Sequence, residues 1–116
     1  MTLDEFRHEM EAYRKSVNEE ASEFKYPYLA VERLLALYQK FDAEERRMAD
    51  QVLAEWVVSE DTGMRYHAKA LVHEFEIVTA IPALQQLAER LASSRAVGAP
   101  GELEVVNRII GDLARG

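Results

Sequence analysis

The chain has 116 residues, enough for one folded domain with its own core, and we expect a single domain over residues 1–116. Its 48% hydrophobic and 30% charged residues are typical of a globular protein, and its formal net charge of −7 argues against binding to nucleic acid or to an acidic membrane. The absence of cysteine excludes disulfides, thiolate nucleophiles and cysteine-bound metals. The acidic start and the lack of a long apolar run lead us to expect a cytoplasmic chain without a signal peptide or membrane span.

Helical periodicity begins at the first residues. Thr2 and Glu5 form a capping-box pattern, a hydroxyl followed three residues later by a carboxylate. An apolar stripe at helical spacing then predicts a first helix over residues 3 to about 24: Leu3, Phe6, Met10, Tyr13, Val17 and Phe24. Pro27 suits the first turn of a second helix, where its missing N–H is not needed. That helix has its predicted buried face at Tyr28, Val31, Leu34, Leu35 and Tyr38.

Four more helices follow. Asp42 and Glu45 predict the cap of a third helix, and residues 59–63 break it from a fourth, which begins near Met64. Ala80-Ile81-Pro82 opens a fifth helix, residues 93–101 form the longest loop, and a sixth helix carries Leu103 to Leu113. No segment alternates long enough to predict a strand. The sequence therefore predicts an all-α fold of about six helices paired in antiparallel hairpins.

The third and fourth helices match each other at a shift of nineteen residues. Both contain an Asp, an Arg four residues on, an Ala, two aliphatic residues, an acid and an aromatic. The matched positions are Asp42, Arg46, Ala49, Val52, Leu53, Glu55 and Trp56 against Asp61, Arg65, Ala68, Leu71, Val72, Glu74 and Phe75. Such a pattern describes one helix type used twice: the Asp caps the start, and the apolar residues, including both aromatics, fill the core.

This pattern and the later Ala80-Ile81-Pro82-Ala83-Leu84 stretch resemble a HEAT-like helical repeat over about residues 42–92. In that family an Asp and an Arg flank the start of the second helix of a pair. The resemblance implies a right-handed α-solenoid of stacked hairpins, with a structural ladder made by Asp61 and Arg65 and by their equivalents Asp42 and Arg46. Such solenoids usually present extended surface to a partner. A compact helical bundle is the alternative fold.

Site chemistry is sparse. Glu5 and His8 have the Glu-x-x-His spacing of bundle metal sites, but no second copy accompanies them. His67 and His73 lie six residues apart on one predicted helix, so they point to different sides, and we expect both at the surface or a half-buried edge. Gly98 to Gly101 lacks the Lys and hydroxyl residue of a phosphate loop. We therefore expect no enzyme, no cofactor and no metal.

The leading hypothesis is a non-catalytic protein-binding module for a basic partner, monomeric when alone. It would act as a stoichiometric inhibitor or adaptor, for example an immunity or antitoxin-type protein. Acidic residues near both ends of the fourth helix and three tyrosines are the predicted contact residues: Tyr26, Tyr28, Glu60, Asp61, Tyr66, Glu74 and Glu76. The alternatives are a small metal- or ligand-binding helical protein using His8, and a structural subunit of a larger assembly.

Overall fold

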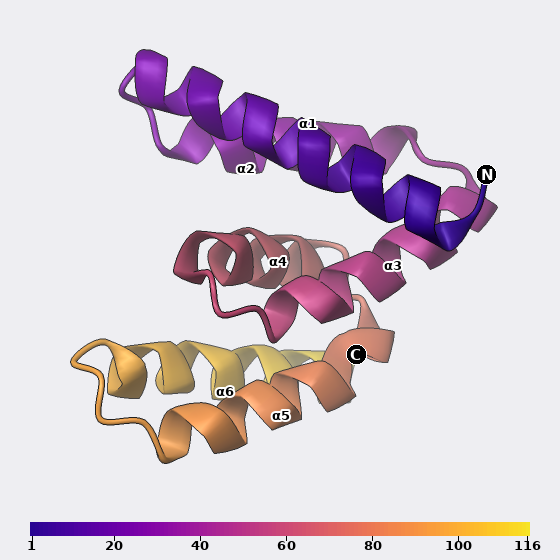
Figure 1. Ribbon diagram of the computed structural model, residues 1–116. Helices are drawn as coiled ribbons and strands as arrows, with labels where there is room; N and C mark the ends of the chain where they lie inside the picture. Colours follow the sequence, from indigo (N-terminus) through magenta and orange to yellow (C-terminus); the bar gives the residue numbers. More distant parts are fainter. The chain divides into compact units, whose positions relative to one another are not determined.

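The computed structural model describes all 116 residues, and all of its regular elements are helical (Figure 1). In chain order they are α1 (Leu3–Glu23), α2 (Tyr28–Lys40), α3 (Ala43–Val57), α4 (Thr62–Glu74), the 3₁₀ segment η1 (Val78–Ala80), α5 (Ile81–Ala92) and α6 (Ala99–Arg115). The prediction of an all-α chain with six helices and no strand is confirmed. No helix combines the length and the apolar character needed to cross a bilayer.

Residue contacts divide the chain into two compact units, Met1–Val52 and Leu53–Gly116, so that α3 contributes to both. In the first unit, α1 and α2 form an antiparallel hairpin (Figure 1). Its apolar faces bury Phe6, Met10, Val17 and Ala21 of α1 and Ala30, Val31, Leu34 and Tyr38 of α2. The predicted capping box is present, since Thr2 and Glu5 exchange backbone-to-side-chain hydrogen bonds of 3.1 Å.

A partly buried polar pair joins the end of α2 to the middle of α3 within the first unit. The Tyr38 hydroxyl donates to Asp50 Oδ1 at 2.8 Å, and the Arg46 guanidinium lies over the Tyr38 ring, 5.2 Å from its centre. Burial raises the pKa of both Tyr38 and Asp50. The predicted cap of α3 is also confirmed: Asp42 Oδ1 accepts from Glu45 N at 2.8 Å, and Glu45 Oε1 accepts from Asp42 N at 2.9 Å.

The second unit contains the α5–α6 hairpin, with α4 packed against α6. Apolar residues at helical spacing form its core: Leu84, Leu87 and Leu91 of α5, Val106, Ile109 and Leu113 of α6, and Ala68, Leu71 and Val72 of α4. Each helix buries one stripe and leaves its charged face to solvent, as amphipathic periodicity requires. The predicted inner positions Ala49, Val52, Leu53 and Trp56 of α3 are buried as well.

Several sequence predictions need correction. Phe24 continues the α1 stripe in sequence but is 67% exposed, because α1 ends at Glu23 and Phe24 caps it. Tyr28, predicted on the buried face of α2, is exposed in the first turn of that helix. Phe75 is only half-buried, unlike its repeat partner Trp56, because it caps the C-terminal end of α4.

Two further corrections concern α4 and α6. His67 was expected at the surface or a half-buried edge but is buried on the inner face of α4. The last loop is shorter than predicted, since α6 already begins at Ala99. Pro100 and Gly101 therefore lie in its first turn, where a proline costs no hydrogen bond.

Helices α1 and α4 end in the same way. In each, the second residue after the helix adopts a left-handed conformation, Lys25 with φ 55° and Glu76 with φ 51°. The backbone N–H of the next residue then bonds five positions back, Tyr26 to the carbonyl of Ala21 and Ile77 to that of Val72, both at 3.0 Å. These are Schellman motifs in which a charged residue replaces the usual glycine.

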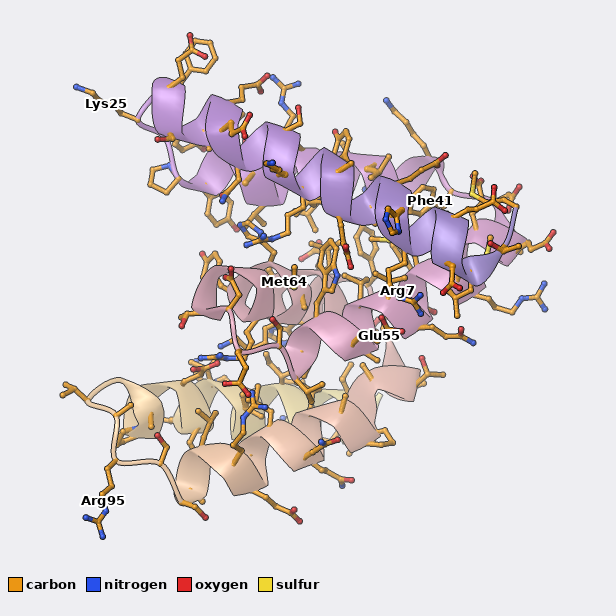
Figure 2. All side chains as sticks on the ribbon, viewed as in Figure 1. Arg7, Lys25, Phe41, Glu55, Met64 and Arg95 are labelled. Atoms are coloured by element: carbon orange, nitrogen blue, oxygen red, sulfur yellow. The ribbon has the colours of Figure 1, made fainter.

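Substitution Lys25→Gly should therefore raise the free energy of unfolding by about 0.5–1 kcal/mol, because glycine adopts positive φ without the clash of a Cβ atom. Lys25 lies at the turn between α1 and α2, and its side chain projects outward (Figure 2), so no packing is lost. Urea unfolding followed by circular dichroism measures the effect. The same change at Lys15, exposed inside α1, should instead cost about 1 kcal/mol. An equal decrease in the free energy of unfolding at both positions would show that the positive φ of Lys25 carries no cost.

Candidate functional site

The two Asp–Arg pairs singled out by the internal repeat make equivalent contacts. Asp61 caps α4 by accepting from Met64 N at 2.9 Å, as Asp42 caps α3. Arg46 donates to the carbonyl of Gln39 at 3.2 Å, and Arg65 to those of Ser59 and Glu60 at 3.0 and 3.2 Å. In both cases an arginine on the first turn of a helix bonds to the backbone that precedes that helix. These four side chains stabilise helix starts.

Three aromatic side chains project from the connection between α1 and α2. Phe24, Tyr26 and Tyr28 are 67%, 45% and 49% exposed, and we call them the aromatic tip. The Tyr26 hydroxyl donates to Glu32 Oε1 at 2.7 Å, a contact that raises the pKa of Tyr26. Two further exposed carboxylates, Glu19 and Glu23, lie on the last turns of α1. The tip therefore joins exposed apolar surface to negative charge.

The predicted acidic residues of α4 fall into two groups. Glu60 and Asp61 precede the helix, and Glu74 and Glu76 lie at its other end; a helix of 13 residues places these ends about 20 Å apart. Glu60 makes only a long 3.6 Å ion pair with Arg90 and is 94% exposed, whereas the side chain of Asp61 serves as a helix cap. The predicted residue Tyr66 lies on α4 with 49% of its surface exposed. The structure thus brings Tyr26 and Tyr28 together, but does not join the four acids in one patch.

At the far end of α4, Glu74 and Glu76 line a shallow hollow of about 340 Å³ with His73, Asp112 and Leu113. His73 Nε2 lies 2.8 Å from Asp112 Oδ2, and Arg115 contacts the same carboxylate at 2.6 Å. These two contacts, with His73 the larger cause, lower the pKa of Asp112. No group of three or more His, Asp or Glu side chains is arranged to hold a metal ion, so the Glu5–His8 spacing gains no support.

A second hollow lies between the N-terminal ends of α4 and α6 and the C-terminal end of α5. It encloses about 650 Å³ and we call it the α4–α6 groove. Its charged lining consists of Glu60, Arg65, Lys69, Arg90 and Glu102. Its remaining walls are small or apolar: Thr62, Tyr66, Leu91, Ser94, Ala96, Gly98, Ala99, Gly101 and Val105. Three cations and two carboxylates therefore face the groove, which leaves one positive charge in excess.

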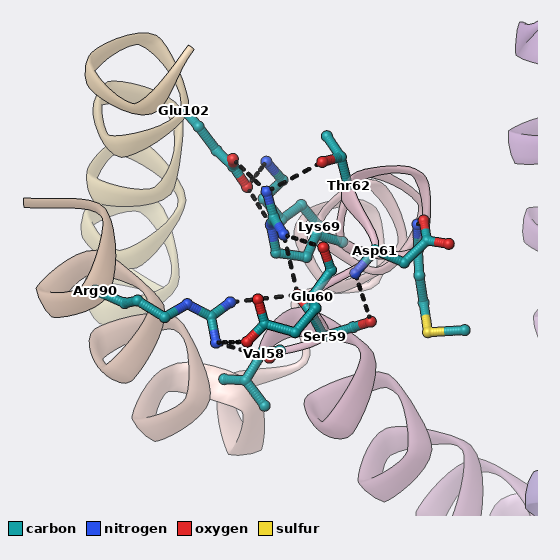
Figure 3. A network of polar contacts seen from close by, with 10 residues as sticks. Val58, Ser59, Glu60, Asp61, Thr62, Lys69, Arg90 and Glu102 are labelled. Carbon is teal, nitrogen blue, oxygen red and sulfur yellow. Dashed lines mark hydrogen bonds and ion pairs between the residues drawn. The ribbon is translucent and has the colours of Figure 1, made fainter. Parts of the chain in front are cut away.

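A partly buried ion cluster of Arg65, Lys69 and Glu102 lines the groove (Figure 3). Glu102 accepts two hydrogen bonds from Arg65, at 2.8 Å from Nε and 3.0 Å from Nη2, and one from Lys69 Nζ at 2.9 Å. The side chains of Arg65, Lys69 and Glu102 are only 12%, 11% and 13% exposed. The bonds from Arg65, aided by Lys69, hold the pKa of Glu102 at about 2.

Arg90 closes one side of the groove from α5. Its Nη1 and Nη2 atoms donate to the carbonyls of Val58 and Ser59 at 2.9 and 3.2 Å (Figure 3). The segment between α3 and α4 is therefore held by two arginines, Arg65 from one side and Arg90 from the other. The groove consequently has a fixed polar floor and wall.

Sequence reasoning missed the residues that build this groove. Glu102 lies 37 positions after Arg65, and no local pattern connects them. Lys69 and Arg90 occupy positions where a helix ordinarily carries a solvated charge. One sequence feature could have pointed to the groove. Gly98-Ala99-Pro100-Gly101 is typical of a helix start without a side-chain cap, and this start of α6 lines the groove. Phe24 was missed as a surface residue because its spacing continues the apolar stripe.

Comparison with protein-family models, with curated proteins and with solved structures finds no match for this chain.

Proposed function

We propose that this chain is a non-catalytic protein-binding module that recognises a basic partner through the aromatic tip. The observation that carries the proposal is the exposure of Phe24, Tyr26 and Tyr28 within five residues of chain. Exposed aromatic residues are enriched among the side chains that dominate binding energy at protein interfaces. A stoichiometric inhibitor or adaptor, such as an immunity or antitoxin-type protein covering a basic toxin, would use such a surface.

Charge supports the choice of a basic partner. The chain carries a net charge of −7, and the carboxylates of Glu19, Glu23 and Glu32 lie on the helices that meet at the tip. Complementary charge raises association rates and selects partners, while the aromatic anchors supply most of the affinity. The strained backbone of Lys25 at the centre of the tip is a further supporting feature, because strain in a folded protein concentrates at functional segments.

We also propose that the six helices stack as hairpins of a HEAT-like solenoid rather than as a closed bundle. The equivalent caps of Asp42 and Asp61, and the equivalent backbone bonds of Arg46 and Arg65, support a repeated structural unit. The antiparallel α1–α2 and α5–α6 hairpins are the other expected components. In a solenoid each hairpin is stabilised mainly by its neighbours.

Affinity capture from the native host tests the binding proposal. The wild-type chain should retain one basic protein near one-to-one, and washing with 1 M salt should weaken its retention. The double variant Tyr26→Ala/Tyr28→Ala should lower the affinity for that partner at least roughly 30-fold, the value for one interface residue worth 2 kcal/mol.

Val78→Ala provides the control, since Val78 of η1 is an apolar residue of similar exposure (52%) that lies outside the aromatic tip and outside the predicted contact residues. It should leave the affinity unchanged. Unaltered binding by the double variant, or a complex that is equally tight in 1 M salt, would refute the proposal. An empty capture accompanied by self-association in light scattering would instead favour a structural subunit.

A further inference from the structure

The α4–α6 groove differs in charge from the rest of this acidic chain. Its lining has one more cation than carboxylate, although the chain as a whole has 14 basic and 21 acidic residues. Its volume of about 650 Å³ lies within the range of small-molecule sites. We propose that this groove binds a small organic molecule through a phosphate or carboxylate group, a role separate from protein binding at the aromatic tip.

Lys69 supplies the first argument. Its ammonium group has three N–H donors, of which one bonds to Glu102 Oε2 at 2.9 Å. The other two have no acceptor in the protein, although the side chain is only 11% exposed. Donors that are so little exposed almost always have a partner, so water or a ligand within the groove must supply the acceptors. A ligand oxyanion provides acceptors and neutralises the excess charge at the same time.

Arg65 does not compete for that role. Two of its nitrogens are committed to Glu102 and a third donates to the carbonyls of Ser59 and Glu60. Arg90 donates one hydrogen bond from each terminal nitrogen to the carbonyls of Val58 and Ser59, but its charge has only a long 3.6 Å ion pair with Glu60, a carboxylate that is 94% exposed. An exposed pair of this length contributes little, so a ligand oxyanion can take its place beside Arg90.

The first turn of α6 opens into the same space. Gly98 has no side chain to cap this 17-residue helix, and Pro100 has no N–H. The amide of Ala99 bonds to the carbonyl of Ala96, which leaves the N–H of Gly101 for a ligand. A Cβ atom built on Gly98 or on Gly101 would meet nothing within 4 Å, so there is room in front of both residues. The partial positive charge of the helix start adds to that of Lys69 and Arg90.

The walls of the groove suit an organic body attached to the anion. Tyr66 and Val105 line it and are 49% and 40% exposed, so each offers apolar surface that is not used in the core. A planar or apolar group lying against them would gain contact area that a free inorganic ion lacks. We therefore expect phenyl phosphate or benzoate to bind more tightly than inorganic phosphate.

Amide NMR of the full-length ¹⁵N-labelled chain, titrated at constant ionic strength with inorganic phosphate, phenyl phosphate and benzoate, tests the proposal. Saturable shifts should occur at Gly98, Gly101 and Glu102, and the two phenyl compounds should also shift Tyr66 and Val105. Tighter binding of phenyl phosphate than of benzoate would identify the headgroup as phosphate, and the reverse order as carboxylate. Uniform shifts that never saturate, for all three compounds, would overturn the proposal.

Two variants and one control make the assignment specific. Lys69→Met should weaken binding at least tenfold. Gly101→Asp should abolish it by placing a carboxylate in the groove, while the first-turn acid leaves α6 folded. Arg108→Gln removes the same charge from an exposed position of α6 outside the groove and should leave affinity unchanged. Binding of wild-type strength by folded Gly101→Asp would show that the groove is not the site.

Discussion

Replacement of Glu102 by glutamine should lower the free energy of unfolding by about 3 kcal/mol, because removing the one anion of a partly buried ion cluster leaves its cations without compensation. Glu102 is the only carboxylate that pairs with Arg65 and Lys69, whose side chains are 12% and 11% exposed. The amide oxygen of Gln can accept two of the three hydrogen bonds, but its NH2 group faces the third donor, and two cations of low exposure then share a neutral partner. Glu102→Gln is thus the most disruptive single change of a polar residue that we predict.

The same cluster sets a pH dependence. The pKa of Glu102 is about 2 in the folded protein against 4.5 ordinarily, so the folded state favours the ionised carboxylate. Its contribution is fully present above pH 4.5 and is lost as the pH falls toward 2. A shift of this size corresponds to about 3 kcal/mol. Wild-type stability should therefore fall steeply below pH 4.5, and the Glu102→Gln variant should show a shallower fall.

Urea unfolding at a series of pH values measures both effects. Glu104→Gln is the matched control, because Glu104 lies on the same helix, is 77% exposed, and pairs with Arg108 at a distance of 3.9 Å. Its loss should change stability by less than about 0.5 kcal/mol. A Glu102→Gln variant as stable as this control would show that the ion cluster contributes nothing to folding.

Leu87→Ala should lower the free energy of unfolding by about 2–5 kcal/mol. Leu87 is fully buried on α5, where that helix packs against α6. Truncation removes buried apolar surface and leaves a cavity that the hairpin fills only partly. Because a small domain is stable by about 5–15 kcal/mol, the change represents a large share of the total. Leu103 on α6 is only half-buried, so the change Leu103→Ala should lower the free energy of unfolding by clearly less than Leu87→Ala does.

Amide hydrogen exchange in the Leu87→Ala variant distinguishes the two proposed arrangements of the helices. In a solenoid the loss of protection should concentrate in α5 and α6 and leave α1 and α2 close to wild type, because repeats depend chiefly on neighbours. A closed bundle shares one core and should lose protection in all six helices together. Uniform loss would therefore reject the HEAT-like stacking.

The contrast between Asp42 and Glu102 shows how far the sequence could lead. Asp42, Thr2 and Asp61 act within three residues of their own positions, and each was correctly predicted to begin a helix. The ion cluster joins residues 33 and 37 positions apart, and which surface charges meet across helices depends on packing that no local pattern encodes. The prediction that Phe24 is buried was wrong for a different reason. Its spacing continues the apolar stripe of α1, but the helix ends one residue earlier, at Glu23.

Two arginines, Arg65 and Arg90, hold the α3–α4 connection through hydrogen bonds that do not depend on the redox state of the surroundings. Arg90 reaches across 31 positions to the carbonyl of Ser59, and Arg65 binds the same carbonyl from α4. In many small domains a disulfide bond would hold such a segment, and whether that bond is formed would depend on the reduction potential of the surroundings. Guanidinium bonds have no oxidised and reduced forms. This fastening therefore holds equally in reducing and oxidising conditions and re-forms without a catalyst each time the chain refolds.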